Sequence, residues 1–239
     1  MKVDLHTHSV FSDGTLTPTD LVQLAAAAGV ELLALTDHDT IDGLPEAQTA
    51  ARSCGIGLLP GVEISANWGQ HGIHILGYGF ECASPALVSF LGQQRLRREI
   101  RAERIGERLA RCGIDGALVG ATQLAGGRVP GRAHFARYLV QQERVPDFAR
   151  AFKRYLAKGR RGYVAAEWPQ LPEVVAAIHQ AGGLASLAHP HHYKLSKALL
   201  RHLLLQFKSA QGDGVEIVTA GDDEGRIEWL AELAVEHGL

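Results

Sequence analysis

The chain has 239 residues, of which 46% are hydrophobic and 21% are charged. This balance is typical of a folded globular protein and excludes a disordered chain, and the length favours one domain with an elaboration. The 24 basic and 26 acidic residues give a formal net charge of −2, which on its face excludes a strongly basic nucleic-acid-binding protein. No apolar run approaches the roughly 20 residues of a membrane helix, and no apolar signal segment opens the chain.

Two residue types stand out in the composition. The three cysteines, Cys54, Cys82 and Cys112, are scattered without C-x-x-C spacing. They predict free thiols in a reducing, cytoplasmic setting and argue against a disulfide framework. The 12 histidines are many for this length. Because neutral imidazole is the commonest metal ligand, they are the first indication of chemistry.

The first 80 residues alternate short apolar strands with helices. A helix is predicted to begin at Thr17, which is a good cap, with Pro18 at the first helical position, and to end at Gly29. A second helix is predicted over 44–54. Strands are predicted over 3–6, 31–36, 56–65 and 73–78. Repeated strand–helix units predict parallel strands with helices outside them.

The pattern changes after residue 80, where no strand signal appears until about residue 160. The elements predicted there are a long helix over 84–112, a glycine-rich loop over 113–131, and helices over 134–142 and 146–157. The alternation then resumes with helices over 171–181, 195–207 and 223–237 and strands over 184–188 and 214–218. We therefore predict a discontinuous α/β barrel domain, 1–80 and 160–239, interrupted by a helical domain over 81–159.

Polar side chains follow the predicted strands, at the end of a parallel barrel where active sites lie. Residues two apart in a strand point the same way, so His6 and His8 are placed to bind one ion, and Glu63 has two oxygens with which to bridge ions. Mixed imidazole and carboxylate ligands suit Mn²⁺, Fe²⁺ or Zn²⁺ better than Ca²⁺. Adjacent ions of this kind favour hydrolysis, most naturally of a phosphate ester. The strand-end residues are His6, His8, Asp13, Asp37, His38, Asp39, Glu63, His74, His189 and Glu216.

Each of these residues taken alone has an ordinary structural explanation. Asp39 and Asp42 are at least as well explained as helix caps, and His74 alone as a packed strand histidine. His191 and His192 lie in a predicted loop, and their role stays open. Only the combination indicates a metal site, made of His6, His8, Asp13, His38, Glu63, His74 and His189.

The motifs DLHTHS at 4–9, SDG at 12–14, TDHD at 36–39, GVE at 61–63 and AHP at 188–190 resemble the PHP (polymerase and histidinol phosphatase) superfamily. The resemblance covers almost the whole chain. It implies a distorted (β/α)7 barrel with three metal ions at the strand ends. The segments over 132–140 and 152–164 resemble, more narrowly, bacterial PHP phosphoesterases. Those enzymes hydrolyse 3′,5′-nucleoside bisphosphates and trim 5′-phosphorylated oligonucleotides from the 5′ end.

The resemblance also implies roles for individual residues. The metal ligands would be His6 and His8 for a first ion, Asp13 and His38 for a second, Glu63 as a bridge, and His74 and His189 for a third. The ions would be up to three, preferably Mn²⁺, and the nucleophile a metal-bound hydroxide, with Asp37 and His192 assisting. The inserted domain would cover the site and bind substrate phosphates, since the arginine fork grips phosphate oxygens in pairs. Its candidates are Arg98, Arg101, Arg132, His134, Lys158 and Arg161.

Two features depart from the superfamily pattern. Its members have a last strand ending in Ser-Asp-x-His, which supplies two further ligands, whereas this sequence ends at His237-Gly238-Leu239. We therefore expect a barrel open beside its first strand, weak binding of the first two ions and low activity. In addition, His192 stands where similar sequences have a phosphate-binding arginine.

The function indicated is a metal-dependent phosphoesterase acting on a nucleotide or a short single-stranded oligonucleotide. The alternatives are another PHP phosphatase, such as one for histidinol phosphate, a polymerase-associated proofreading exonuclease, and a catalytically weakened metal- or nucleic-acid-binding module. An amidohydrolase is disfavoured because no lysine lies at a predicted strand end. We expect a cytoplasmic protein with no membrane association and no protein partner.

The net charge conceals a division within the chain. Residues 93–161 contain 17 basic and 6 acidic residues, a net charge of +11, whereas the rest contains 7 basic and 20 acidic, a net charge of −13. An arginine- and glutamate-rich solvated helix explains part of 93–111 but not 128–161, where 10 basic residues face 2 acidic ones. The division predicts an acidic, cation-binding barrel facing a basic cover.

Overall fold

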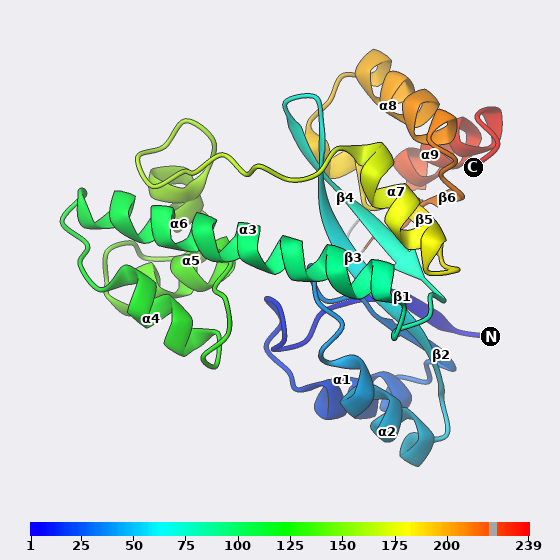
Figure 1. Ribbon diagram of the computed structural model, residues 1–239, viewed down its shortest axis with the longest axis horizontal. Coiled ribbons are helices and arrows are strands. Elements are labelled where there is room, and N and C mark those ends of the chain that lie inside the picture. The colour runs from blue at the N-terminus through cyan, green and yellow to red at the C-terminus, as the bar shows by residue number, and fades with distance from the viewer. Residues whose placement is uncertain (220–223) are drawn as a thin grey trace.

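The protein is described by a computed structural model that covers residues 1–219 and 224–239. Within these residues a six-stranded sheet forms the centre of an α/β fold and curls into a half-barrel (Figure 1). The strands pair in chain order, so β1 and β6 are the two ends of the sheet. They are β1 (Val3–Thr7), β2 (Leu32–Leu35), β3 (Gly57–Trp68), β4 (His71–Tyr78), β5 (Leu184–Leu187) and β6 (Gly214–Val215).

The prediction that all strands run parallel is wrong for β4. The pairs β1–β2, β2–β3 and β5–β6 are parallel, but β4 runs antiparallel to both β3 and β5. Only Gly69 and Gln70 separate β3 from β4, and Gly69 has a φ of +55°. A two-residue connection closes a hairpin, whereas a parallel pair needs a crossover of a dozen residues or more.

The hairpin places two predicted ligands in the middle of strands instead of at strand ends. Glu63 pairs with Leu76, and His74 pairs with Ser65. Opposed residues in an antiparallel pair share one face of the sheet, as do residues two apart in a strand. Glu63 and His74 are therefore diagonal neighbours on one face, which is the reason that they meet.

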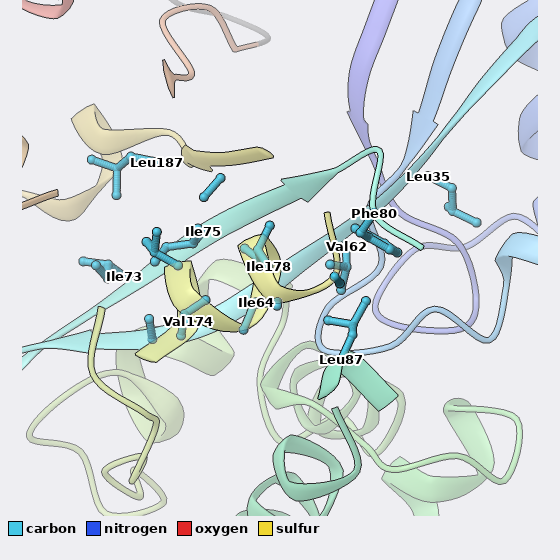
Figure 2. Close-up of a cluster of buried hydrophobic side chains, with 14 of the residues drawn as sticks. Leu35, Val62, Ile64, Ile73, Ile75, Phe80, Leu87, Val174, Ile178 and Leu187 are labelled. Atoms are coloured by element: carbon cyan, nitrogen blue, oxygen red, sulfur yellow. The ribbon is translucent and has the colours of Figure 1, made fainter. Parts of the chain in front are cut away.

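The helices around the sheet bury its apolar side chains in one hydrophobic cluster. They are α1 (Pro18–Ala27), α2 (Leu44–Cys54), α7 (Leu171–Gln180), α8 (Lys197–Ser209), α9 (Glu224–Glu236) and the first part of α3 (Pro85–Ala110). Figure 2 shows Val174 and Ile178 of α7 packed against Ile64 of the hairpin. In the same view Leu87 of α3 lies near Val62. This core holds the hairpin rigidly beneath the polar face that carries Glu63.

A second hydrophobic cluster lies among the helices between β4 and β5, at the left in Figure 1. The helix α3 runs from the sheet into this region and carries residues of both clusters. The other helices there are α4 (Ala117–Leu124), α5 (Arg132–Gln141), α6 (Phe148–Ala151) and the π-helical turn η1 (Phe152–Leu156). The chain returns from η1 to α7 by way of Trp168, which is buried.

The prediction of a loop over 113–131 missed the helix α4. The glycines of this segment suggested a loop, but glycines here allow neighbouring helices to approach closely. A Cβ at Gly120 would lie 2.1 Å from the Tyr138 ring, and one at Gly106 would lie 2.9 Å from Cβ of Leu118. Ala117 and Ala121 are buried one turn apart. In this segment small residues mark a helix contact.

Other boundaries differ at element ends. The last strand, β6, has two residues where five were predicted, and the 3₁₀ turn η2 (Pro190–Tyr193) lies in the predicted loop after β5. The predicted helix start at Asp223 lies outside the described residues. Over the parts of the chain that the structure describes, no helix has the length and apolar character to cross a membrane. Cys54, Cys82 and Cys112 are all free thiols.

Candidate metal centre and substrate cavity

The carboxylate of Glu63 lies at the centre of the candidate site. Its side chain is only 1% exposed, yet five imidazoles surround it. Nε2 of His6, Nε2 of His8 and Nδ1 of His38 are each 3.1 Å from Oε2. Nδ1 of His74 lies 2.7 Å from Oε1, and Nε2 of His189 lies 2.9 Å from the same oxygen. Oε2 of Glu63 therefore has three imidazole nitrogens around it, and Oε1 has two.

Four strands, β1, β2, β4 and β5, bring these imidazoles to Glu63 of β3. His6 lies in β1 with His8 directly after it, two residues apart as the sequence predicts. His38 follows β2, where its backbone pairs with Glu63 in a parallel bridge. His189 follows β5 with a φ of +26°, a conformation that residues other than glycine adopt rarely. The surrounding hydrogen bonds hold that backbone in place.

The electrostatics of Glu63 and His38 suit a metal ion. Burial would raise the pKa of Glu63, but His38, His74 and the other imidazoles hold it well below its usual value. Burial lowers the pKa of His38, so its ring is neutral at pH 7. Its Nδ1 has no hydrogen-bond partner despite lying 3.1 Å from Glu63 Oε2. A buried neutral imidazole beside an ionised carboxylate is the donor set that a divalent transition-metal ion requires.

The ligand atoms also group as metal sites do. His6, Glu63 and His189 offer atoms within 4.8 Å of one another, and so do His8, His38 and Glu63. Glu63 belongs to both groups, so its carboxylate is next to both candidate ion positions. This arrangement suits two or more ions that share the carboxylate.

Asp13 stands at the rim of the cluster and is 36% exposed. Its Oδ1 lies 3.8 Å from Nδ1 of His8, and its Oδ2 lies 3.9 Å from Nε2 of His38. Burial raises the pKa of Asp13, but the neighbouring His38 and His8 outweigh that effect and lower it. The carboxylate is therefore ionised and close enough to share an ion with either histidine.

Glu216 is a second carboxylate at this site, directly after β6. Oε1 of Glu216 lies 2.9 Å from Nδ1 of His6, and Oε2 accepts a hydrogen bond from the backbone N–H of His189 at 2.7 Å. Burial would lower the pKa of His6, but the hydrogen bonds to Glu216 and Glu63 raise it to about 10. The sequence placed Glu216 at a strand end but not among the ligands. Its contacts orient two candidate ligands, His6 and His189, in the way that outer carboxylates orient ligands in metal sites.

Tyr193 links the backbones that carry His74 and His189. Its buried hydroxyl donates to the carbonyl oxygen of Ala188 at 2.6 Å and accepts from the backbone N–H of His74 at 2.9 Å. His192 stacks on His189 with ring centroids 5.4 Å apart and lines the cavity. It therefore occupies the mouth of the site, beside a candidate ligand.

Two aspartates near His38 hold the fold around the site. Asp37 is 1% exposed and accepts hydrogen bonds from the hydroxyls of Ser9 and Ser12, each at 2.6 Å, so its oxygens brace the loop after β1 and do not face the cavity. The interpretation of Asp39 as a helix cap is wrong, because the cap of α2 is Gly43. Asp39 is buried instead against Arg98.

Asp39 joins the sheet to the long helix α3. Its Oδ2 accepts from Nε of Arg98 at 2.6 Å, and its Oδ1 accepts from the Ser65 backbone N–H at 2.7 Å and from Nε2 of Gln94 at 2.9 Å. Burial raises the pKa of Asp39, but Arg98 and the Ser65 hydrogen bond lower it. The ion pair fixes Arg98 beside the cluster. Another guanidinium nitrogen of Arg98 reaches the hydroxyl of Ser65 at 3.1 Å.

A cavity of about 1150 Å³ opens over the cluster, with His38, His74 and His189 in its floor. The part of its wall that comes from the helical region is rich in basic residues. Five of the six residues predicted to contact substrate phosphates line it: Arg98, Arg101, Arg132, His134 and Lys158. Arg161 is exposed and does not line the cavity. The cavity also contains Arg128, a residue that sequence reasoning did not single out.

The arginines in the walls are crowded and partly desolvated. Burial lowers the pKa of Arg101 to about 10, with the neighbouring Arg132 and Arg98 adding to the effect. The guanidinium groups of Arg98 and Arg101 lie over the Trp168 ring, at 5.4 and 5.6 Å from its centroid. His134 is neutral, since burial and Arg137 lower its pKa to about 4. Crowded cations without enough carboxylates provide a site for a dianionic ligand.

Comparison with known proteins agrees with this geometry. A family model of the PHP domain matches residues 4–165. The chain belongs to the PHP domain family. It is 47% identical over 238 residues to a 5′-3′ exoribonuclease from Haemophilus influenzae, covering 100% of this chain and 86% of the relative. It is 42% identical to a 3′,5′-nucleoside bisphosphate phosphatase from Chromobacterium violaceum, covering 100% of this chain and 84% of the relative.

Solved structures share the whole PHP fold of this chain. A Chromobacterium violaceum structure described as an amidohydrolase with bound sulfate and no metal is 42% identical and superposes with a TM-score of 0.95. A structure from Bifidobacterium adolescentis is 30% identical and superposes with a TM-score of 0.88. Each match covers 100% of this chain and 84% of the other. The curled sheet and its helical elaboration are therefore shared with both of these structures.

Proposed function

We propose that this PHP protein is a metal-dependent phosphoesterase of nucleotides. It converts 3′,5′-nucleoside bisphosphates to nucleoside 5′-phosphates and trims short 5′-phosphorylated oligonucleotides from the 5′ end. The observation that carries the proposal is the convergence of five imidazoles on the buried Glu63, beneath a cavity walled by arginines. The names of the Haemophilus influenzae and Chromobacterium violaceum relatives supply the substrate class.

In this proposal the cluster holds up to three divalent ions, preferably Mn²⁺. The ligands are His6, His8, Asp13, His38, Glu63, His74 and His189. Such ions, when bound, polarise phosphoryl oxygens and activate water at neutral pH. No side chain of the protein needs to form a covalent bond to phosphorus. Glu63 supplies the shared negative charge that keeps the ions together, and Glu216 keeps His6 turned toward them.

The arginines do the work of binding and charge neutralisation. Arg98 is held by Asp39 and Arg101 is stacked on Trp168, so both guanidinium groups are oriented before substrate arrives. Arg132, His134 and Lys158 line the same walls. A phosphate between these cations and the metal ions is stabilised most when its charge increases in the transition state. Pre-oriented cations supply that stabilisation without reorganising.

The domain arrangement follows from the same contacts. We propose that residues 1–80 and 160–239 form the metal-binding part, a distorted PHP barrel. Residues 81–159 form an inserted helical domain that covers the site. The two separate hydrophobic clusters support this division, and the Asp39–Arg98 pair couples the parts.

A phosphate-release assay tests the function. The protein with Mn²⁺ should release inorganic phosphate from adenosine 3′,5′-bisphosphate, and His6→Ala and His38→Ala should abolish the release. His71→Ala is the matched control, because His71 is exposed at the start of β4. Turnover of histidinol phosphate alone, without the bisphosphate, would overturn the proposal.

A further inference from the structure

Phe148 has an unusual position for a phenylalanine. Of the seven phenylalanines in the sequence, all within the described residues, it alone is exposed, with 46% of its surface accessible. It is the first residue of α6 and lines the cavity. It belongs to neither hydrophobic cluster of the described residues. Core packing therefore does not explain it.

The neighbours of Phe148 extend it into a small aromatic surface. The ring of Phe152 lies 5.2 Å away, tilted by 45°, and also lines the cavity. The guanidinium of Arg132 lies 5.7 Å from the centroid of Phe152. Phe152 packs against the second hydrophobic cluster and is partly buried. The second ring is thus fixed by the core, while Phe148 presents its surface to the cavity.

The surroundings of these rings attract a polyanion. Residues 144–161 contain seven basic residues and one acidic residue. Arg150, Lys153 and Lys158 are exposed there, and Lys158 lines the cavity with the two rings. The volume of about 1150 Å³ also exceeds the roughly 300–1000 Å³ of sites for one small ligand. The cavity has room for more than the nucleotide that reacts.

We propose that Phe148, supported by Phe152, is a stacking platform for a base of a single-stranded oligonucleotide, beyond the nucleotide whose phosphate reacts. This inference rests on the proposed function and adds a subsite to it. Aromatic rings beside cations bind single strands without sequence preference, because every base has a flat face and every nucleotide a phosphate. The platform explains how one cavity serves both a bisphosphate and a longer chain.

Steady-state kinetics with two substrates test the subsite. Adenosine 3′,5′-bisphosphate has a single base, whereas a 5′-phosphorylated tetra-adenylate carries further bases past the reacting phosphate. Phe148→Ala should raise the KM of the tetranucleotide about tenfold relative to that of the bisphosphate. Phe148→Trp should keep the wild-type ratio of the two KM values. Val119→Ala is the control, because Val119 is 62% exposed on α4 and lies outside the cavity.

A binding measurement separates stacking from turnover. Anisotropy of a 3′-labelled phosphorothioate tetranucleotide with Mn²⁺ gives its Kd, and one base at a time is replaced by an abasic ribose. Wild type should lose about tenfold in affinity for an abasic substitution at one position, and Phe148→Ala should show no such loss there. Equal abasic losses in both proteins at every position would overturn the proposal. So would an unchanged KM ratio in Phe148→Ala.

These experiments distinguish a failure of the proposed function from a failure of the proposed subsite. A wild-type protein that hydrolyses neither substrate refutes the proposed activity, yet the abasic series still reports whether Phe148 stacks on a base. A protein that hydrolyses both substrates with the same KM ratio in wild type and Phe148→Ala keeps its function and loses the subsite. Circular dichroism of each variant confirms that its fold is intact.

Discussion

The sheet region around Glu63 and the helical region across the cavity differ in the charge that they can bind. The first offers ligand atoms for cations, and the second offers guanidinium groups for anions. Around Glu63, five imidazoles and the carboxylates of Asp13 and Glu216 gather donors for cations. Across the cavity, Arg98, Arg101 and Arg132 gather positive charge with few carboxylates to balance it. Neither region is satisfied alone, and a phosphate bound to metal ions satisfies both. In the proposed function, the substrate phosphate lies between the two regions and balances the charge of each.

The largest effect is expected from removing the charge at the centre of the sheet region. Glu63→Gln should lower phosphate release by about a thousandfold, because a neutral amide does not hold the ions together. Bound metal, measured by mass spectrometry, should fall with it. Glu228→Gln, on the exposed face of α9, should leave both unchanged. A Glu63→Gln protein with full metal content and activity would contradict a shared carboxylate.

The next effect concerns the ion pair that joins the two regions. Asp39→Asn should lower the free energy of unfolding by about 3 kcal/mol, since Arg98 would keep its buried charge without a full partner. Denaturant titration measures the loss. The matched control is Glu99→Gln, which removes an exposed pair with Arg95 and should cost less than about 1 kcal/mol. Equal losses in the two variants would show that the regions are not coupled through Asp39.

A smaller effect is expected behind the metal ligands. Glu216→Gln leaves the ligand set intact but removes the charged acceptor for His6 and His189. Metal affinity should fall by about 10- to 100-fold, as it does when outer carboxylates are lost. Activity should recover at high Mn²⁺, which separates this role from that of Glu63. A loss that added Mn²⁺ does not restore would make Glu216 a direct ligand.

The smallest effect lies at the far end of the sheet and depends on pH. Asp213 accepts from His179 and from the Ala185 backbone N–H, and these bonds lower its pKa although burial opposes them. A lowered carboxyl pKa stabilises the fold above the unfolded pKa of about 3.9, and that stability is lost as the pH falls through the folded value.

Wild type should therefore exceed Asp213→Asn by less than about 1 kcal/mol in unfolding free energy at pH 5. The difference should shrink toward pH 3, as Asp213 becomes protonated. Thermal unfolding at both pH values measures it. A difference that grows on acidification would reverse the sign of the argument and exclude the ion pair as its source.

The local signals in the sequence were strong wherever a single residue determines backbone geometry. Thr17 and Pro18 marked the start of α1, and the range 44–54 predicted for the second helix is the observed range of α2, which Gly55 caps. The same reasoning failed for α4, because glycine has two uses. At Gly120 the absence of a side chain admits the Tyr138 ring, and only the partner helix shows that use. Strand direction was also misjudged at β4, where the two-residue Gly69–Gln70 turn was not recognised as a hairpin.

The residue types of the candidate site could be identified from the amino-acid order. The spacing of His6 and His8 and the division of charge between the two regions are properties of the chain order alone. Only the tertiary structure decided which groups meet. Glu216 reaches His6 across 210 residues, and Asp39 pairs with Arg98 from another element. Contacts of this kind depend on how strands and helices pack, since side chains distant in sequence become neighbours only when burial of the apolar faces fixes their positions.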